Sequence, residues 1–409
     1  MKRKVCSLVL GMVSVALLAG CKADKEENYA ETQQKKVELT VWGAEEDEEL
    51  MGKVIQSFEE HYQGRADFQI SFQAQSESGC KDVLLNGLEE GADVFTFADD
   101  QLSSLAAAGA IDPVGKEEIK DSALPAAVEA ASVGDTLYAY PLTADNGYFL
   151  YYNKKYFSDK QVETLDDILK VAAAENKLFV MDWSSAWYVY SFFGNTGLEI
   201  GLNDDGITNY CTWNKSDGDI KGTDVARAML DIAGSRGFDS RTDEEFLSGV
   251  KDGSVIAGIS GVWNAVAIGE AWGKDMGASK LPSYTCDGRQ VQMASFSGCK
   301  LIGVNAYSKH PVWAARLAEW ITNEDNQTLR FEMRGQGPSD LKVADSEEIR
   351  QSPAIAALLE QSEYAQLQRV GGKFWDPVSE FAGNMAAGNP SGESLQKQLD
   401  KMSENVCGR

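Results

Sequence analysis

Apolar and polar positions alternate from residue 37 onward in patterns that predict an α/β fold. Residues 37–42, 67–73 and 92–97 are predicted strands, because β-forming side chains dominate and either alternate with polar ones or run together. Residues 50–62 and 80–90 carry apolar side chains at helical spacing. Such a β-α-β-α-β order requires parallel strands with helices on both faces of the sheet.

The rest of the chain continues to mix strands and helices. Further strands are predicted at 137–141, 148–153, 254–260 and 301–305, and residues 165–193 combine helix and strand. Helices are predicted at 101–108, 225–232, 244–250, 311–321, 327–334, 352–361 and 394–404. Polar turns are predicted over residues 195–224. Within them, residues 203–219 are rich in Asn, Asp and Gly but lack the register of a calcium loop, which favours surface turns over a calcium site.

Composition narrows the class of function. The 409 residues carry a formal net charge of −25, which disfavours nucleic-acid binding because phosphates require basic surface. The two histidines, His61 and His310, are too few for a three-histidine zinc site. The chain has no G-x-S-x-G motif, P-loop or complete G-x-G-x-x-G motif. We therefore expect no enzymatic activity, no metal and no cofactor.

The N-terminal segment predicts export and anchoring. Basic residues at 2–4 precede a 15-residue apolar stretch that is short for a membrane span. The stretch ends in LAGC at 18–21, which resembles the lipobox of bacterial lipoproteins, whose cysteine receives a lipid. We predict a signal peptide over 1–20, lipidation of Cys21 and a flexible tether over 21–36. A plain signal peptide with an incidental cysteine is the alternative.

Five cysteines follow Cys21, and an odd number leaves at least one unpaired. Cys286 and Cys299 flank Asp287-Gly288, a dipeptide typical of hairpin turns, so they are candidates for a hairpin disulfide. Five separate thiols are the alternative.

Six segments, in this order, carry a family resemblance. They are LTVWG (39–43), ADVFTFADDQLSSLAAAGAIDPV (92–114), GDTLYAYPLTADNGYFLYYNKKYF (134–157), VIAGISGVWN (255–264), GVNAYSKHPVWAARLAEWIT (303–322) and FWDPV (374–378). Together they resemble bacterial extracellular solute-binding proteins of the maltose/maltodextrin-binding type, which serve ABC sugar importers. The resemblance covers residues 37–405, essentially the whole domain that would follow the tether.

The resemblance implies a two-lobed, periplasmic-binding-protein-like α/β fold of type II. Each lobe would be a mainly parallel sheet flanked by helices, with a ligand cleft at the hinge that closes on the solute. The implied N-terminal lobe comprises 37–145 plus 299–351, the C-terminal lobe comprises 146–298 plus 352–409, and the chain crosses between them near 144–147, 296–300 and 350–354.

Aromatic side chains are the first class of candidate ligand contacts, because rings stack on the C–H faces of sugars. The resemblance places Trp187, Trp263 and Trp375 at the cleft, with a core position as the alternative for each. Phe97 matches a tryptophan of the family and is equally compatible with the core. Weaker candidates beside Trp187 are Trp183 and Tyr188, whereas Trp42 is expected in the core because it ends a buried strand.

Polar side chains are the second class, because carboxylates and amides bond to paired hydroxyls. Asp100 and Asp145 match acidic cleft residues of the family, although an Asx turn is the alternative for Asp145. Gln101 stands where the family commonly has arginine. Glu45 and Glu46 match polar contacts, or else they favour the N-terminus of a helix through its dipole. A glycine-broken loop adds three weaker candidates: Arg334, Gln336 and Ser339.

The resemblance implies a lipid-anchored, monomeric binding protein on the extracellular face of the cell membrane. Its partners would be the permease subunits of an ABC importer and an oligosaccharide, most simply a malto-oligosaccharide. Alternatives are a binding protein for another oligosaccharide or small solute, or a surface glycan hydrolase or sensor.

Overall fold

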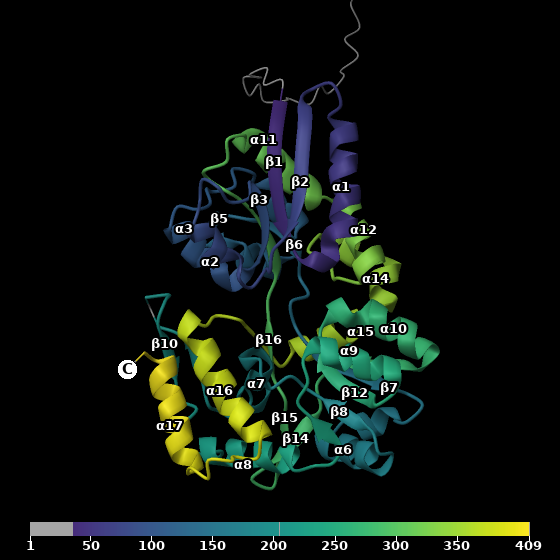
Figure 1. Ribbon diagram of the computed structural model, residues 1–409, viewed down its shortest axis with the longest axis vertical. Helices are drawn as coiled ribbons and strands as arrows, with labels where there is room; N and C mark the ends of the chain where they lie inside the picture. The colour runs from purple at the N-terminus through teal and green to yellow at the C-terminus, as the bar shows by residue number, and fades with distance from the viewer. Residues whose placement is uncertain (1–35, 204, 409) are drawn as a thin grey trace, which may run out of the picture. The chain divides into compact units, whose positions relative to one another are not determined.

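Two five-stranded sheets organise residues 36–203 and 205–408, the part of the chain that the computed structural model describes (Figure 1). The first sheet has the order β2-β1-β3-β17-β6. Its strands are β1 (Lys36–Gly43), β2 (Asp67–Ala74), β3 (Val94–Ala98), β6 (Tyr140–Thr143) and β17 (Lys300–Val304). The second has the order β11-β8-β12-β7-β13. Its strands are β7 (Phe149–Asn153), β8 (Leu178–Val180), β11 (Phe238–Asp239), β12 (Val255–Ser260) and β13 (Met276–Ser279).

We call each sheet with its helices a lobe. The first lobe has α1 (Glu48–His61), α2 (Cys80–Leu85), α3 (Leu102–Ala107), α4 (Glu118–Ser122), α5 (Pro125–Ala130), α11 (Pro311–Ile321), α12 (Glu324–Arg334), α13 (Leu341–Ala344) and α14 (Glu347–Gln351). The second has α6 (Leu165–Ala174), α7 (Ala186–Phe193), α8 (Gly222–Ala233), α9 (Asp243–Asp252), α10 (Ala265–Trp272), α15 (Pro353–Ser362), α16 (Trp375–Ala386) and α17 (Leu395–Val406). The mixed α/β, two-lobed fold predicted from sequence is thus confirmed.

Both sheets are mainly parallel, as predicted, and each contains one strand that runs antiparallel to the other four. In the first, β1 runs parallel to β2 and β3, whereas β17 runs antiparallel to β3 and β6. In the second, β8 runs parallel to β11 and β12, whereas β7 runs antiparallel to β12 and β13. The antiparallel strands β7 and β17 are the ones that enter a sheet just after the chain has come from the other lobe. Their direction therefore depends on tertiary connections that local periodicity does not contain.

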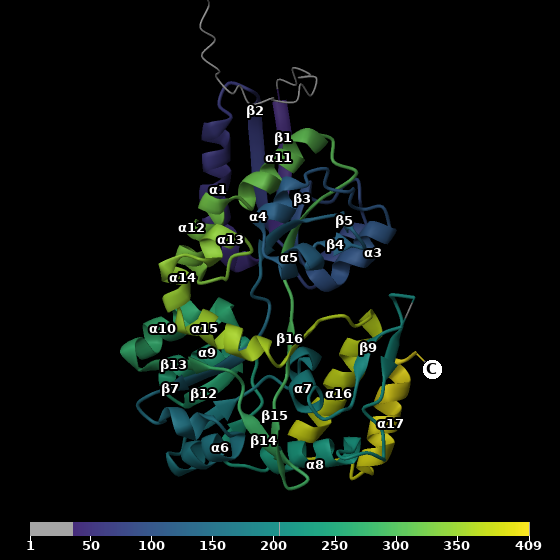
Figure 2. The same cartoon turned by 180° about the vertical axis from the view of Figure 1, so that it is seen from behind.

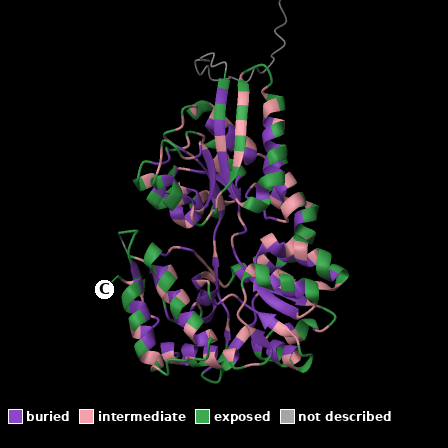
Figure 3. Cartoon of the chain, in the orientation of Figure 1, coloured by how far each residue is buried: buried purple, intermediate pink, exposed green. Residues whose placement is uncertain are grey.

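Helices cover both faces of the first sheet, as its β-α-β-α-β order predicts. Alternate residues of β1, including Val37 and Leu39, pack with apolar side chains of α1 and α11. Phe95 and Phe97 of β3 face the opposite way and pack with side chains of α2, α3 and α5. Burial depends on the position of a strand in its sheet (Figure 3). β12, inside the second sheet, is buried along its whole length, whereas β2, at the edge of the first sheet, alternates mostly between exposed and half-buried residues.

The segments that link the lobes run close to one another. The chain passes from β6 to β7 through residues 144–148, and from β16 (Ser295–Ser297) to β17 through residues 298–299. β16 pairs with β18 (Ala365–Leu367), which belongs to the second lobe. Short 3-10 turns sit at the ends of several strands, including η1 (Glu45–Asp47), η2 (Asp99–Gln101), η4 (Val262–Asn264) and η6 (Gly372–Phe374). The figures show the linking strands passing between the two groups of elements (Figure 2).

Several local predictions need correction. The predicted helix over 80–90 ends at Leu85, and the predicted surface turns over 195–224 contain a small hairpin, β9 (Ile200–Leu202) with β10 (Asn209–Cys211). The hairpin at Asp287-Gly288 is present as β14 (Ser283–Cys286) and β15 (Arg289–Gln292), and both turn residues have positive φ. The disulfide is absent, because Cys286 and Cys299 are both free and lie in the cores of different lobes.

The predicted signal peptide, Cys21 and nearly all of the predicted tether lie outside the described residues; Lys36, the last tether residue, begins β1. Within the described residues, no helix combines the length and apolar character that a membrane crossing requires.

Candidate ligand cleft

A cleft of about 1030 Å³ is lined by residues from both lobes and by Asn146 from a linking segment. On the first lobe, its lining follows the carboxyl ends of three parallel strands: Glu45 and Glu46 follow β1, Gln75 to Ser78 follow β2, and Asp100 follows β3. On the second, Trp187 follows β8 and Trp263 follows β12. Ligands of open α/β sheets bind at this edge because loops there are free of sheet pairing. The volume suits a ligand of several sugar rings.

Three tryptophans form what we call the aromatic wall, namely Trp187, Trp263 and Trp375. All three line the cleft, where the family resemblance places them, and their contact with ligand stays a prediction. The rings of Trp187 and Trp263 lie 5.7 Å apart at an interplanar angle of 36°. Trp375 begins α16 and packs edge-on against the buried ring of Phe374, 5.0 Å away. Each ring is therefore held from behind while it contributes to the surface of the cleft.

A half-buried carboxylate, Asp243, fixes the ring of Trp263. Asp243 begins α9 and accepts a hydrogen bond of 3.1 Å from the indole nitrogen of Trp263. Ser260 and Tyr188 donate to the same carboxylate through their hydroxyl groups, at 2.7 and 3.2 Å, and Asn264 donates through its amide. Burial raises the pKa of Asp243, and these donors act in the opposite direction by stabilising the charged form.

Gly261 gives the Trp263 ring its space. A Cβ atom at this position would lie 2.0 Å from Cζ3 of Trp263, so any side chain here would displace the ring. The backbone oxygen of Gly261 also accepts a hydrogen bond of 3.0 Å from the buried hydroxyl group of Tyr151. The ring orientation is thus set by a hydrogen bond at its nitrogen and by close backbone contact at its edge.

The opposite side, which we call the polar wall, comes from the first lobe. It consists of Glu45, Glu46, Gln75, Glu77, Asp100, Lys300, Arg334 and Gln336. Glu45 and Glu46 form the first turn of the helical segment that continues into α1. The two interpretations offered by the sequence therefore both hold in space, since these carboxylates sit at a helix N-terminus and line the cleft.

The basic residues of the polar wall are paired. Lys300 lies 2.6 Å from Glu77 and is largely buried with it. Arg334 donates to Asp47 at 3.0 Å, and Arg330 binds the same carboxylate from behind. Burial favours a higher pKa for Asp47, but the charge and hydrogen bond of Arg330 outweigh it and lower the pKa below its usual value. These pairs fix the position of the polar wall.

Asp100 is the most perturbed acid of the cleft. Burial, with the adjacent charge of Asp99, raises the pKa of Asp100 to about 7. Its Oδ1 atom is buried without a hydrogen-bond partner among the described residues. Asp99 itself is paired with Arg369 at 2.7 Å. An unsatisfied acceptor in a cleft is a site at which a ligand donor would gain more than it gains in water.

Three residues predicted at the cleft lie outside its lining. Phe97 is fully buried because strand alternation puts it on the same face as Phe95. Gln101 is buried, accepts from the backbone of Lys81 and donates to the backbone of Glu77. Asp145 is buried in a linking segment, where it accepts from the backbone nitrogen of Gly337. We no longer expect these side chains to contact ligand, because packing or internal hydrogen bonds occupy them.

The weaker candidates divide in the same way. Arg334 and Gln336 line the cleft, whereas Ser339 is fully buried. Trp183 is buried against Phe192 and Phe238, and Trp42 lies in the core as expected.

Sequence reasoning missed Glu77, Lys300, Gln368 and Asp243. Glu77 could have been predicted from the sequence, since it follows a predicted strand as Glu45 and Asp100 do. No local pattern connects Asp243 to Trp263, 20 residues later, or Lys300 to Glu77. Those contacts exist only once the sheets have assembled.

The described residues contain no cluster of His, Cys, Asp and Glu suited to a metal.

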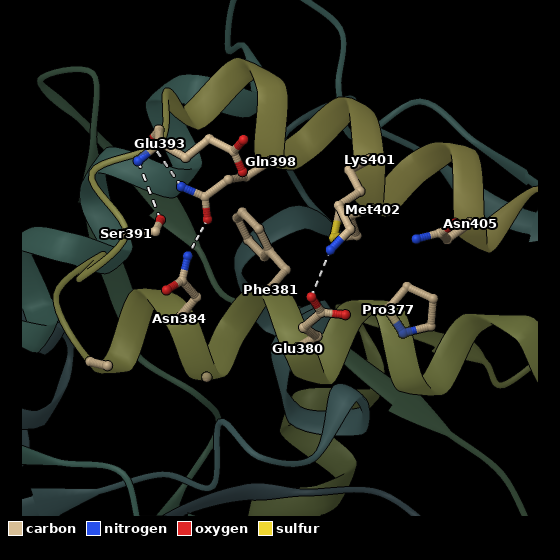
Figure 4. A pocket seen from close by; sticks show the side chains of 12 residues that line it. Pro377, Glu380, Phe381, Asn384, Ser391, Glu393, Gln398, Lys401, Met402 and Asn405 are labelled. Carbon is tan, nitrogen blue, oxygen red and sulfur yellow. Dashed lines mark hydrogen bonds and ion pairs between the residues drawn. The ribbon is translucent and has the colours of Figure 1, made fainter.

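A second, smaller depression of about 450 Å³ lies between α16 and α17 (Figure 4). Four of its polar side chains are already paired with one another: Lys401 with Glu380 at 2.8 Å, and Gln398 with Asn384. It contributes no ring surface comparable with the aromatic wall, so the larger cleft is the candidate site.

Comparisons with known proteins found a matching family model and two relatives that cover most of the chain. A family model described as "Bacterial extracellular solute-binding protein" matches residues 53–357. A galactooligosaccharide-binding protein of Bacillus subtilis (strain 168) is 27% identical over 99% of this chain and 97% of its own length. A maltotriose-binding protein of Pyrococcus abyssi (strain GE5 / Orsay) is 24% identical over 80% of this chain and 72% of its own.

The fold has close counterparts among solved structures. A protein solved with acarbose superposes with a TM-score of 0.81 and 27% sequence identity, covering 91% of this chain and 99% of that one. The superposition extends across both lobes, since it covers nearly all of the described residues.

Proposed function

Because this chain belongs to the bacterial extracellular solute-binding proteins, we propose that it captures malto-oligosaccharides for an ABC importer. The observation that carries the proposal is the cleft itself. It has a volume of about 1030 Å³, with three tryptophans on one side and a wall of carboxylates and amides on the other. Rings stack on sugar faces, and the polar groups bond to paired hydroxyls. Relatives described as maltotriose-binding and as solved with acarbose support this ligand class.

Hinge closure is the proposed mode of capture. The proposed lobes are residues 37–145 plus 299–351 and residues 146–298 plus 352–409. The aromatic and polar walls belong to different lobes, so a sugar that contacts both would favour the closed arrangement. The cycle requires no covalent step, and we propose that the protein has no catalytic activity.

The proposed setting follows from the N-terminal sequence. We propose that Cys21 carries lipid, that the mature protein is an anchored monomer on the extracellular face of the membrane, and that permease subunits recognise its closed form. Replacing Cys21 with Ala is expected to release the protein into the medium or periplasm, as measured by cell fractionation. Unchanged membrane association would contradict the anchor.

A galacto-oligosaccharide is the second candidate ligand. The relative of Bacillus subtilis that covers nearly the whole chain is described as binding this class. Galactosides and glucosides differ in the orientation of one ring hydroxyl, so the same stacking surface accommodates either, and polar contacts discriminate between them.

Thermal unfolding of residues 22–409 in the presence of a sugar panel tests both candidates. A ligand that binds only the folded state raises the melting temperature as its concentration increases. We expect a shift with maltotriose and maltotetraose, and galacto-oligosaccharides of equal length serve as the comparison. A shift with galacto-oligosaccharides alone would make them the ligand in place of malto-oligosaccharides. No shift with any oligosaccharide would contradict the proposal.

A further inference from the structure

The charges lining the cleft are unbalanced. Two of the lining residues are basic, Lys300 and Arg334, and each already contacts a carboxylate, Glu77 at 2.6 Å and Asp47 at 3.0 Å. The structure therefore offers no unpaired cation among the described residues that line the cleft. A bound anion would have to compete with an internal ion pair for either one.

Three acidic residues of the lining have no such basic partner. Glu45 and Glu46 are exposed in the first turn before α1 and form no ion pair with any described residue. Asp100 has a buried oxygen without a hydrogen-bond partner among the described residues. The nearby cation Arg369 forms its ion pair with the adjacent Asp99. The uncompensated negative charge of the cleft thus lies at Glu45 and Glu46, whose carboxylate oxygens only accept hydrogen bonds.

We propose that the cleft accepts neutral and amino-substituted oligosaccharides and excludes oligosaccharides that carry a carboxylate. The proposal rests on the function proposed above and specifies its substrate class. Hydroxyl and ammonium groups supply the donors that the carboxylates of Glu45 and Glu46 lack, whereas a carboxylate placed there meets like charges in a partly enclosed site.

Three probes of nearly equal size test the proposal: maltotriose, and two analogues in which the hydroxymethyl group of the central ring is replaced by a carboxylate or by an aminomethyl group. Calorimetry at low ionic strength, where surface charges are least screened, is the measurement. We expect the carboxylate analogue to bind about tenfold or more weakly than maltotriose, and the aminomethyl analogue to bind at least as tightly.

The double variant Glu45→Gln/Glu46→Gln is expected to bring the two analogues closer in affinity. The matched control is Glu347→Gln/Glu348→Gln, which removes two exposed acids from the first turn of α14, outside the cleft lining. This control should leave the ratio between the analogues unchanged.

The outcomes separate the two proposals. If the three probes bind equally, or the carboxylate analogue binds as tightly as the aminomethyl analogue, charge selection is overturned while oligosaccharide capture stands. If the aminomethyl analogue binds and maltotriose does not, charge selection stands and the proposed ligand fails. Binding of none of the three would defeat both.

Discussion

The two walls of the cleft solve different parts of one recognition problem. The aromatic wall, on the second lobe, offers flat apolar surface held by the half-buried carboxylate of Asp243 and by close backbone contact. The polar wall, on the first lobe, offers directional acceptors whose scaffold is a set of buried ion pairs. Ring stacking is tolerant of hydroxyl orientation, whereas hydrogen bonds are not. The comparison therefore suggests affinity from one wall and discrimination from the other.

Removing the charge that anchors the polar wall is expected to have the largest effect. Asp47→Asn leaves Arg330 buried without a counter-charge, which should reduce the free energy of unfolding by about 3–5 kcal/mol. Chemical denaturation at pH 7 measures the loss. Glu49→Gln, an exposed change on α1, is the control and should change stability little.

The pH dependence of this variant checks the same mechanism. Because the pKa of Asp47 is lowered in the fold, its contribution is present above its unfolded value near 4 and is lost as pH falls through its folded value. The stability difference between the wild type and Asp47→Asn should therefore shrink below about pH 4. A difference that stays constant from pH 7 to pH 3 would show that the ion pair is not its source.

Removing a ring from the aromatic wall is expected to weaken binding more than it weakens the fold. Trp263→Ala should reduce the affinity for the sugar that gives the largest thermal shift by about 1–3 kcal/mol, the scale of a lost aromatic contact. Trp313→Ala, which removes a half-buried ring from the first-lobe core, should lower stability without lowering affinity. Unchanged affinity in both Trp263→Ala and Trp375→Ala would remove the aromatic wall from the site.

Displacing the ring without deleting it gives a sharper test. Gly261→Ala places a methyl group where the Trp263 ring lies, so affinity should fall by about 1–2 kcal/mol. Gly269→Ala on α10 is the control, because its Cβ would meet only a sulfur atom at 3.7 Å. If Gly261→Ala binds sugar as the wild type does, the ring position described here is not the one that matters.

The smallest expected effect concerns the residue behind the ring. Asp243→Asn retains the side-chain volume but removes the charge that gathers four donors, and affinity should fall by about 1 kcal/mol. Glu244→Gln changes the same charge at the next position of α9 and should leave affinity intact. Asp243→Asn is also measured in the background of Trp263→Ala. If it lowers affinity there by as much as it does in the wild type, Asp243 acts independently of the ring.

Much of this molecule follows from its sequence. The alternation of β1 and β2 and the helical spacing of α1 predict an α/β fold with helices on both faces of a sheet. The family resemblance adds the two lobes and the site candidates, and six of the nine principal candidates line the cleft. Phe97, Gln101 and Asp145 do not, because packing or internal hydrogen bonds occupy them, although Phe97 and Gln101 lie at the end of β3 as Asp100 does. Position after a strand is a local feature, whereas the partners of each side chain depend on the assembled fold.

The tertiary structure alone decided the rest. The direction of β7 and β17, the separation of Cys286 from Cys299, and the pairs Lys300–Glu77 and Asp243–Trp263 join segments that local periodicity treats independently. Sequence pattern records which faces must be buried, because burial repeats with the period of a strand or helix. It does not record which charges meet, because a contact between two lobes or two loops leaves no period along the chain.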